Sequence, residues 1–134
     1  MIFLLDANAC IRYLRDPKSR VRQELSSRPP SAIRLSSVVM SELYRGALRS
    51  KNPPVERAKV DAFAVPYTIQ PFHAAESFTH AEIRVDLERR GLAIGPYDML
   101  IAAIAKANGF TLVTHNTVEF SRIPNLLLVG WETP

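Results

Sequence analysis

The sequence of 134 residues contains a single cysteine, Cys10, and only five glycines. One cysteine cannot form an internal disulfide bond, so the fold needs no oxidising compartment. Because Cys10 lies between the apolar residues Ala9 and Ile11, we expect a buried structural thiol. The scarcity of glycine argues against a glycine-rich phosphate-binding loop.

Long hydrophobic runs are also missing. No apolar run approaches the roughly 20 residues that a transmembrane helix requires. The opening MIFLL reaches Asp6 without the basic segment or the cleavage site of a signal peptide. We therefore expect a cytoplasmic protein that does not associate with a membrane. We see no repeat, linker or low-complexity segment, so residues 1–134 should form one domain.

The composition is that of an ordinary globular domain. Hydrophobic residues make up 47% of the chain and charged residues 22%, which suits one compact core at this length. Seventeen Lys and Arg exceed thirteen Asp and Glu, which gives a formal net charge of +4. This charge is compatible with an anionic partner such as nucleic acid, but many proteins are mildly basic, so charge alone does not identify the partner.

Short apolar segments alternate with helical patterns along the chain, and they predict five strands and five longer helices. The strands are expected at 2–5, 33–35, 67–70, 110–114 and 126–129, and the helices at 9–15, 38–49, 55–65, 73–90 and 96–108. Residues 116–124 indicate a turn or one short helical turn. The alternation favours an α/β fold with a parallel sheet, helices on both faces, and a site at the carboxyl ends of the strands.

Two acidic residues stand at informative positions in the first half of the chain. Asp6 directly follows the first predicted strand, which places its carboxylate at the carboxyl edge of the sheet. From position alone, a turn or helix-capping role for Asp6 stays open. Glu42 lies about 60° from Val39 around its helix, at the margin of the apolar stripe. The alternative for Glu42 is a surface ion pair with Arg45.

A third acid, Asp98, lies in the predicted helix 96–108, which is apolar on nearly every side. Asp98 shares a face with Ile101 and Ala105, so its carboxylate should point toward the core. Burying it without compensation would cost several kcal/mol. The alternative is an acid that offsets the helix dipole in the first turn, after Gly95 as cap and Pro96 as the first helical residue.

Three carboxylates that met at one edge of the sheet would repel one another and raise each other's pKa unless a cation held them together. Hard divalent ions such as Mg²⁺ or Mn²⁺ suit such oxygen ligands. The sequence does not favour a zinc site, because His73, His80 and His115 are scattered and Cys10 is single.

Four segments, in order, resemble the PIN-domain family: FLLDANACI, SSVVMSELYRGA, GPYDMLIAAIAKANG and LVTHNTVEFSRIPNL. Together they span essentially the whole chain. Within that family, SELYRGA and the last segment are most similar to VapC-type toxin ribonucleases of type II toxin–antitoxin systems. The resemblance implies a single PIN-like nuclease domain over residues 1–134. It also implies a three-layer α/β/α fold in which helices surround a short, mostly parallel central sheet.

The resemblance further implies the site residues. In the family's pattern, Asp6, Glu42 and Asp98 are the catalytic and metal-binding acids. The family's fourth acidic position holds Asn116 here, and Glu119 follows three residues later. Either could complete the site, because Asn116 offers a carbonyl oxygen to a metal ion and Glu119 offers a charge for catalysis.

Further residues near the predicted acids could orient or bind a ligand. Asn8 and Thr114 stand beside the turns that carry acids and could orient a ligand, a water or a phosphate, although Thr114 could simply cap a strand end. Basic residues on the elements that carry Asp6 and Glu42 could bind RNA phosphates, the alternative being a solvated charged face. These basic residues are Arg12, Arg45, Arg49 and Lys51.

The function implied by the resemblance is that of a Mg²⁺- or Mn²⁺-dependent endoribonuclease. Similar proteins cleave RNA, often a tRNA, by metal-activated water and thereby inhibit translation and growth. They form homodimers and bind a VapB-like antitoxin. Two alternatives stay open. One is an inactive PIN scaffold that binds RNA or protein, because Asn116 replaces an acid. The other is a phosphotransfer enzyme similar to haloacid dehalogenases, although Asn8 stands where those enzymes normally carry a second Asp.

Overall fold

Five short strands form one sheet in the order β3-β2-β1-β4-β5, and all four pairings are parallel. The computed structural model describes residues 1–132. The strands are β1 (Phe3–Leu5), β2 (Ile33–Ser36), β3 (Thr68–Gln70), β4 (Thr111–Val113) and β5 (Leu128–Val129). Parallel neighbours need long crossover connections, and helices supply them here.

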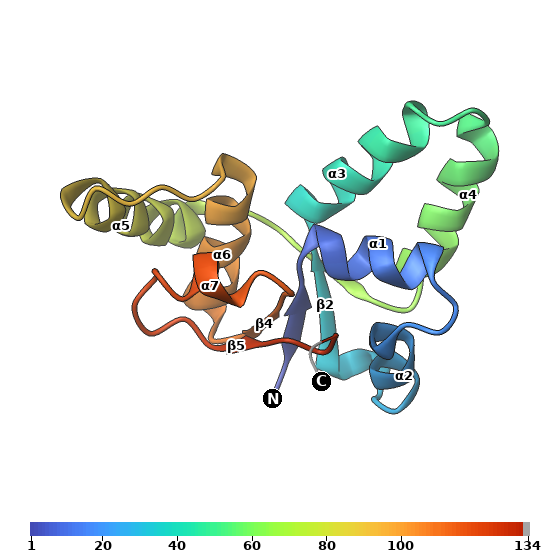
Figure 1. Ribbon diagram of the computed structural model, residues 1–134, viewed down its shortest axis with the longest axis horizontal. Helices are drawn as coiled ribbons and strands as arrows, with labels where there is room; N and C mark the ends of the chain where they lie inside the picture. The colour runs from blue at the N-terminus through green and yellow to red at the C-terminus, as the bar shows by residue number, and fades with distance from the viewer. Residues whose placement is uncertain (133–134) are drawn as a thin grey trace.

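Helices cover both faces of this sheet (Figure 1). Helices α1, α2 and α4 lie on one side and α5 and α6 on the other, while α3 contacts both α1 and α6. The helices are α1 (Ala7–Arg15), α2 (Arg20–Ser26), α3 (Ser37–Leu48), α4 (Pro53–Ala64), α5 (Ala74–Arg89), α6 (Pro96–Asn108) and α7 (Thr117–Phe120), with a 3₁₀ helix at Pro30–Ala32. The predicted three-layer α/β/α architecture is confirmed, and the sheet is parallel throughout.

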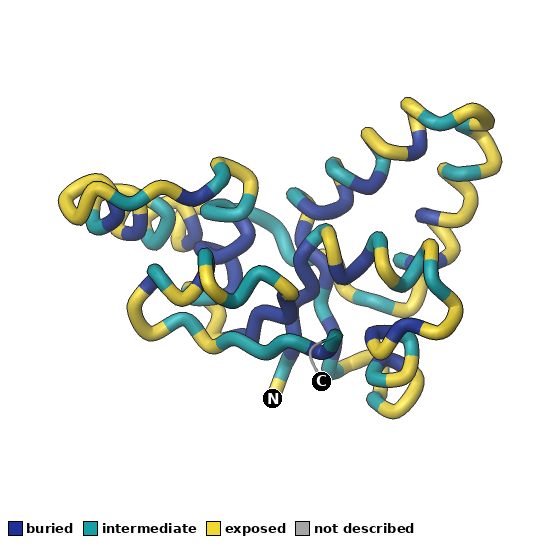
Figure 2. The backbone as a smooth tube through the Cα atoms, in the orientation of Figure 1, coloured by how far each residue is buried: buried dark blue, intermediate teal, exposed yellow. Residues whose placement is uncertain are grey.

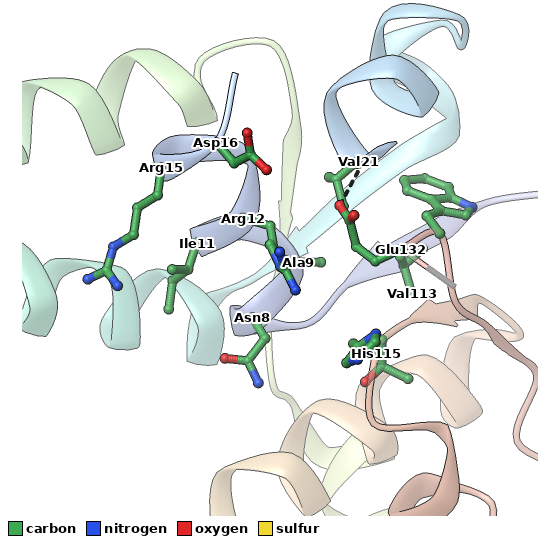
Figure 3. Close-up of a pocket in the computed structure, with 12 residues that line it drawn as sticks. Asn8, Ala9, Ile11, Arg12, Arg15, Asp16, Val21, Val113, His115 and Glu132 are labelled. Carbon is green, nitrogen blue, oxygen red and sulfur yellow. Dashed lines mark hydrogen bonds between the residues drawn. The ribbon is translucent and has the colours of Figure 1, made fainter. Parts of the chain in front are cut away.

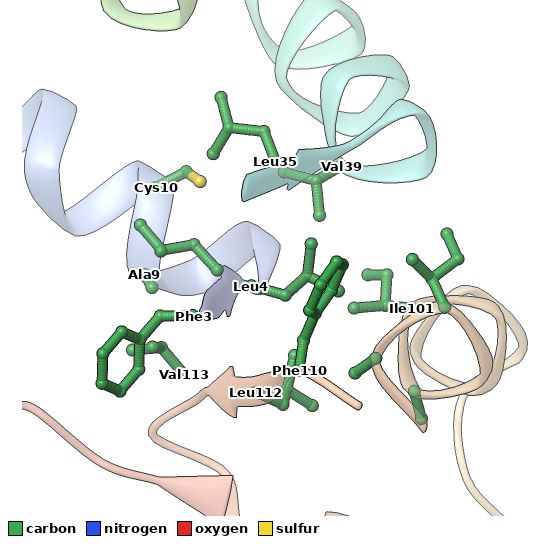
Figure 4. Close-up of a cluster of buried hydrophobic side chains, with 14 of the residues drawn as sticks. Phe3, Leu4, Ala9, Cys10, Leu35, Val39, Ile101, Phe110, Leu112 and Val113 are labelled. Atoms are coloured by element: carbon green, nitrogen blue, oxygen red, sulfur yellow. The ribbon is translucent and has the colours of Figure 1, made fainter. Parts of the chain in front are cut away.

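The centre of the core is formed by β1, β4 and α6. Every residue of β1 and β4 is buried, as are residues 101–105 of α6, which agrees with the apolar sequence of that helix. Figure 4 shows Cys10 in this core near Leu35 and Val39. Cys10 is fully buried, so the prediction of a structural thiol is confirmed.

Two helix ends follow directly from single residues. The Ser36 hydroxyl at the end of β2 accepts a hydrogen bond from the Val39 N–H at 3.0 Å and so caps α3. Gly109 ends α6 in the left-handed region, with φ of 70°, which a residue without a Cβ adopts readily. The Ser36 cap fixes where α3 begins, and Gly109 ends α6 shortly before β4 begins.

Helix α2 and the 3₁₀ helix were not predicted from the sequence. The seven residues of α2 bury only Val21 and Leu25. These two apolar residues span little more than one helical turn, and most of their neighbours are polar or charged. Helix α1 also begins two residues earlier than predicted, because Asp6 caps it. Strand β5 is shorter than the apolar run LLLV that predicted it.

The C-terminal segment is fixed against the start of the chain. The rings of Trp131 and Phe3 lie 5.3 Å apart between centroids, and the Arg28 guanidinium lies over both rings. The Glu132 carboxylate accepts a hydrogen bond from the Val21 N–H at 3.1 Å. The segment therefore joins β1 to the N-terminal end of α2.

Burial follows the layers of the fold. Figure 2 shows buried backbone in the strands and in α6, and exposed backbone in the α3–α4 connection and the outer part of α5. Among the described residues, no helix combines the length and the apolar character needed to cross a membrane.

The importance of the central strand can be tested with one substitution at two positions. Leu4 is fully buried and Leu48 is 69% exposed. Leu4→Ala should lower the free energy of unfolding by about 2–5 kcal/mol, because it leaves a cavity in the core, whereas Leu48→Ala should change it by less than about 0.5 kcal/mol. Urea denaturation measures both values. Equal losses at the two positions would contradict this description of the core.

Candidate active site

The carboxyl ends of β1 and β4 form the central edge of the site. The chain leaves β1 toward β2 and leaves β4 toward β5, so it departs from these adjacent strands in opposite directions. Open α/β sheets bind ligands at such a switch point. Asp6 follows β1, and Thr114 follows β4. The Asp6 N–H donates to the Val113 carbonyl at 3.0 Å, which joins the two strand ends.

Asp6 is a buried carboxylate, 3% exposed. One of its oxygens accepts a hydrogen bond from the Ala9 N–H at 2.8 Å, which caps α1. Burial raises the pKa of Asp6, while hydrogen bonds from Thr114 and Ala9 and the charge of His115 lower it in part. Asp6 therefore caps a helix and also faces the site, so the two interpretations of this residue are compatible.

Glu42 lies half-buried on α3, on the margin of its buried face. Burial raises the pKa of Glu42, and the nearby charges of Asp98 and Asp6 raise it further. In residues 1–132 Glu42 has no ion-pair partner, so the alternative of a pair with Arg45 is not formed. The Glu42 carboxylate is therefore within electrostatic reach of two other acids and forms no ion pair in residues 1–132.

Asp98 lies in the first turn of α6, with Gly95 as the N-cap and Pro96 as the first helical residue. Burial raises the pKa of Asp98 to about 6, with contributions from Asp6 and Glu119. The helix-dipole interpretation of Asp98 is therefore compatible with a site role. The sheet edge, α3 and α6 bring Asp6, Glu42 and Asp98 within electrostatic reach of one another, and this set is called the acid cluster below.

The acid cluster suits a divalent cation by its chemistry. All three donors are carboxylates, which Mg²⁺ and Mn²⁺ prefer, and no Lys, Arg or His of residues 1–132 forms an ion pair with any of them. Within the described part of the chain, however, no group of three or more His, Cys, Asp or Glu side chains lies close enough together to hold a metal ion as it stands.

Asn116 and Glu119 form a separate hydrogen-bonded unit. The Asn116 amide caps α7 and donates to one Glu119 oxygen at 2.7 Å. The other Glu119 oxygen accepts from the Gly95 N–H at 3.1 Å. These two hydrogen bonds lower the pKa of Glu119, so the carboxylate stays ionised. Glu119 thereby ties α7 to the end of α6 that carries Asp98, a link that the sequence analysis missed.

Thr114 and Asn8 lie where the sequence predicted, beside the acid-bearing turns. The buried Thr114 hydroxyl accepts a hydrogen bond from the Asn116 N–H at 3.0 Å and also bonds to Asp6. Thr114 therefore both shapes the turn after β4 and orients Asp6. Asn8 is exposed at the start of α1, where it lines a cavity with Arg12 and His115 (Figure 3).

The basic residues predicted to bind RNA do not share one surface hollow. Arg12 lines the cavity of Figure 3. Arg45 and Arg49 line a different hollow on α3, to which none of the three acids contributes. Lys51 is exposed in the turn between α3 and α4. The structure thus places only Arg12 of these four in the cavity beside the acid cluster.

Comparisons with known proteins agree with this architecture. The sequence model of the PIN domain matches residues 3–126. The chain is 39% identical over 133 residues to "Ribonuclease VapC2" of Rickettsia felis, covering 98% of this chain and 99% of the relative. It is 33% identical over 129 residues to "tRNA(fMet)-specific endonuclease VapC" of Shigella flexneri, covering 96% and 97%.

A solved structure extends this likeness to three dimensions. The crystal structure of VapBC2 from Rickettsia felis, bound to a DNA fragment from the promoter, contains a chain that matches with a TM-score of 0.92 and 38% identity. The match covers 98% of this chain and 99% of that one. The chain studied here therefore belongs to the PIN-domain family, in its group of VapC toxin ribonucleases.

Proposed function

We propose that this protein is the toxin of a VapBC-type pair and that it cleaves RNA at the acid cluster with Mg²⁺ or Mn²⁺. The observation that carries this proposal is the set of three carboxylates at the switch point of the sheet, where the charge of Asp6 raises the pKa of both Glu42 and Asp98. The names of the relatives, ribonuclease and endonuclease, support the same activity.

Each acid has a defined structural task in this proposal. Asp6, Glu42 and Asp98 would hold the divalent ion, which when bound supplies a Lewis acid that activates water and stabilises charge on the phosphate. Thr114 and the Ala9 N–H fix the Asp6 carboxylate at the strand edge. The Glu119 carboxylate fixes Gly95, the residue that caps the helix of Asp98.

The roles of Glu119 and Asn116 follow from their hydrogen bonds. Both Glu119 oxygens accept hydrogen bonds, one from Asn116 and one from Gly95. We infer that Glu119 mainly positions Asp98 and that Asn116 supports Glu119, although either oxygen donor could reach an ion through a water molecule. Asp6, Glu42 and Asp98 then carry most of the negative charge that a bound ion would neutralise.

Partners are proposed from the relatives. The structural neighbour from Rickettsia felis is a VapBC complex, so we propose a VapB-like antitoxin as the protein partner of this chain. The Shigella flexneri relative is named for tRNA(fMet), which makes a tRNA the first substrate to test. We also propose that the protein forms a homodimer and acts in the cytoplasm. Neither a phosphotransfer activity nor an inactive scaffold is favoured by relatives that carry ribonuclease names.

Nuclease activity can be tested on total bacterial RNA with purified, antitoxin-free protein. We expect cleavage with Mg²⁺ or Mn²⁺, none with EDTA, and at least about a 100-fold loss in Asp98→Asn, because even the residues behind metal ligands commonly contribute 10–100-fold. The exposed Glu82 on α5 provides the control Glu82→Gln, which should cleave normally. Cleavage that persists in EDTA or in Asp98→Asn would refute the proposed site.

The repulsion within the acid cluster predicts a pH-dependent effect on stability. The pKa of Asp98 rises from 3.8 to about 6 in the folded chain, so its ionised form opposes folding. The stabilising contribution of protonated Asp98 is full below pH 3.8 and is lost as the pH rises through about 6. Without divalent ions, Asp98→Asn should therefore raise the free energy of unfolding near pH 8 by about 1 kcal/mol, after allowance for solvent screening.

The measurement is urea denaturation of both proteins at two pH values. Near pH 4 the difference between Asp98→Asn and the parent protein should shrink, because the parent carboxyl is then largely protonated. Glu82→Gln again serves as the control and should show no such pH-dependent difference. A variant that is less stable than the parent near pH 8 would show that the ionised Asp98 is compensated in the folded state.

A further inference from the structure

A cavity of about 430 Å³ opens beside the acid cluster. Its walls are α1, the start of α2, the turn after β4 and the C-terminal segment (Figure 3). Thr114 lines this cavity and also bonds to Asp6, so the cavity and the acid cluster share a wall. Its volume lies in the range of roughly 300–1,000 Å³ that is usual for small-ligand sites.

The charged side chains of this cavity are not equivalent. Asp16 and Glu132 line it, but each carboxylate already accepts a hydrogen bond from a backbone N–H, at 2.9 and 3.1 Å. Arg12 and Arg15 also line it, and within residues 1–132 neither forms an ion pair. The guanidinium donors therefore remain available to an anion from solution.

Two further donors lie near Arg12. Figure 3 shows Asn8 and Arg12 projecting from α1 and His115 from the opposite wall. The charge of His115 lowers the pKa of Asp6, which places His115 close to the acid cluster. A cationic guanidinium, an amide and an imidazole thus surround the part of the cavity that borders the cluster. Such a group of donors fits a phosphate.

We propose that this cavity binds the nucleotide that adjoins the scissile phosphodiester of the RNA. Arg12 and His115 contact the phosphate of that nucleotide. The base occupies the more apolar part of the cavity, which Ile11 and Trp131 help to line. The inference rests on the proposed ribonuclease activity and deepens it, because it names the residues that hold the substrate beside the acid cluster.

Electrostatics explains why a ribonuclease needs such contacts here. An RNA strand carries a phosphate at every nucleotide, and the three carboxylates of the acid cluster repel the phosphates that flank the scissile bond. Cations next to the cluster offset that repulsion and fix the register of the strand. Arg12 and His115 line the cavity that borders Asp6 through Thr114, so they are placed to supply such contacts.

The only tryptophan of the chain provides a direct probe, because Trp131 lines this cavity. We would titrate the purified chain with the four nucleoside 5′-monophosphates, and separately with inorganic phosphate, in EDTA, and follow Trp131 emission. We expect a saturable change with the nucleotides. Arg12→Ala and His115→Ala should each raise the Kd about tenfold, as for loss of a charge-assisted hydrogen bond. Arg89→Ala, at an exposed arginine on α5, is the matched control and should bind like the parent.

RNA cleavage by the same variants separates binding from chemistry. Arg12→Ala and His115→Ala should raise KM about tenfold while kcat changes by less than about twofold. Circular dichroism checks the fold, and His115→Asn, which keeps a hydrogen-bonding side chain, should bind more tightly than His115→Ala.

The outcomes distinguish this inference from the proposed function. Nucleotide binding that depends on Arg12 and His115 supports the cavity site, even if the protein cleaves no RNA. The absence of RNA cleavage would overturn the proposed ribonuclease activity instead. RNA cleavage without any response of Trp131 to nucleotides, or with binding unchanged in both variants, overturns the cavity site. If inorganic phosphate changed the Trp131 emission as much as the nucleotides do, the proposed contact with the base would be overturned. A response to the co-expressed antitoxin but not to nucleotides would make the cavity a protein-docking surface and also overturn the proposal.

Discussion

Repulsion between partly buried carboxylates is the constraint on which the rest of this structure depends. Burial raises the pKa of Asp6, Glu42 and Asp98, and nearby acids raise the pKa of Glu42 and of Asp98 further. A protein optimised only for stability would place such groups in solvent or pair them with lysine or arginine. Holding them together costs stability that the charge of His115 offsets only in part, and a divalent ion would remove much of that cost.

Short parallel strands and helix N-termini make this arrangement possible. Asp6 caps α1, Asp98 lies in the first turn of α6, and Asn116 caps α7. The positive end of a helix dipole favours an ionised acid at such positions, which offsets part of the repulsion. Asp6 therefore follows a strand and starts a helix, and Asp98 and Asn116 also lie at helix starts. The Glu119 bond to Gly95 then sets where α6 begins relative to the turn after β4.

Much of this could be predicted from the sequence, because alternating apolar segments imply a parallel α/β sheet and strand ends imply its site. Other features depend on tertiary contacts that leave no local pattern. The two apolar residues of α2 are too few to reveal a helix. Arg45 shares a helix with Glu42, yet it lines another hollow. Neither the link from Glu119 to Gly95 nor the cavity beside His115 could be found by spacing, although His115 directly follows the motif residue Thr114. The metal-ligand roles of the acids remain predictions.

Binding of Mn²⁺ to the metal-free protein, measured by isothermal titration calorimetry, tests the central claim most directly. The account predicts saturable binding that weakens as the pH falls through about 6, where Asp98 takes up a proton, and that releases protons in this range. Asp98→Asn should abolish most of the binding, and Glu82→Gln should leave it intact. Absence of binding near pH 8, or equal binding by Asp98→Asn, would contradict the claim that these acids share a cation.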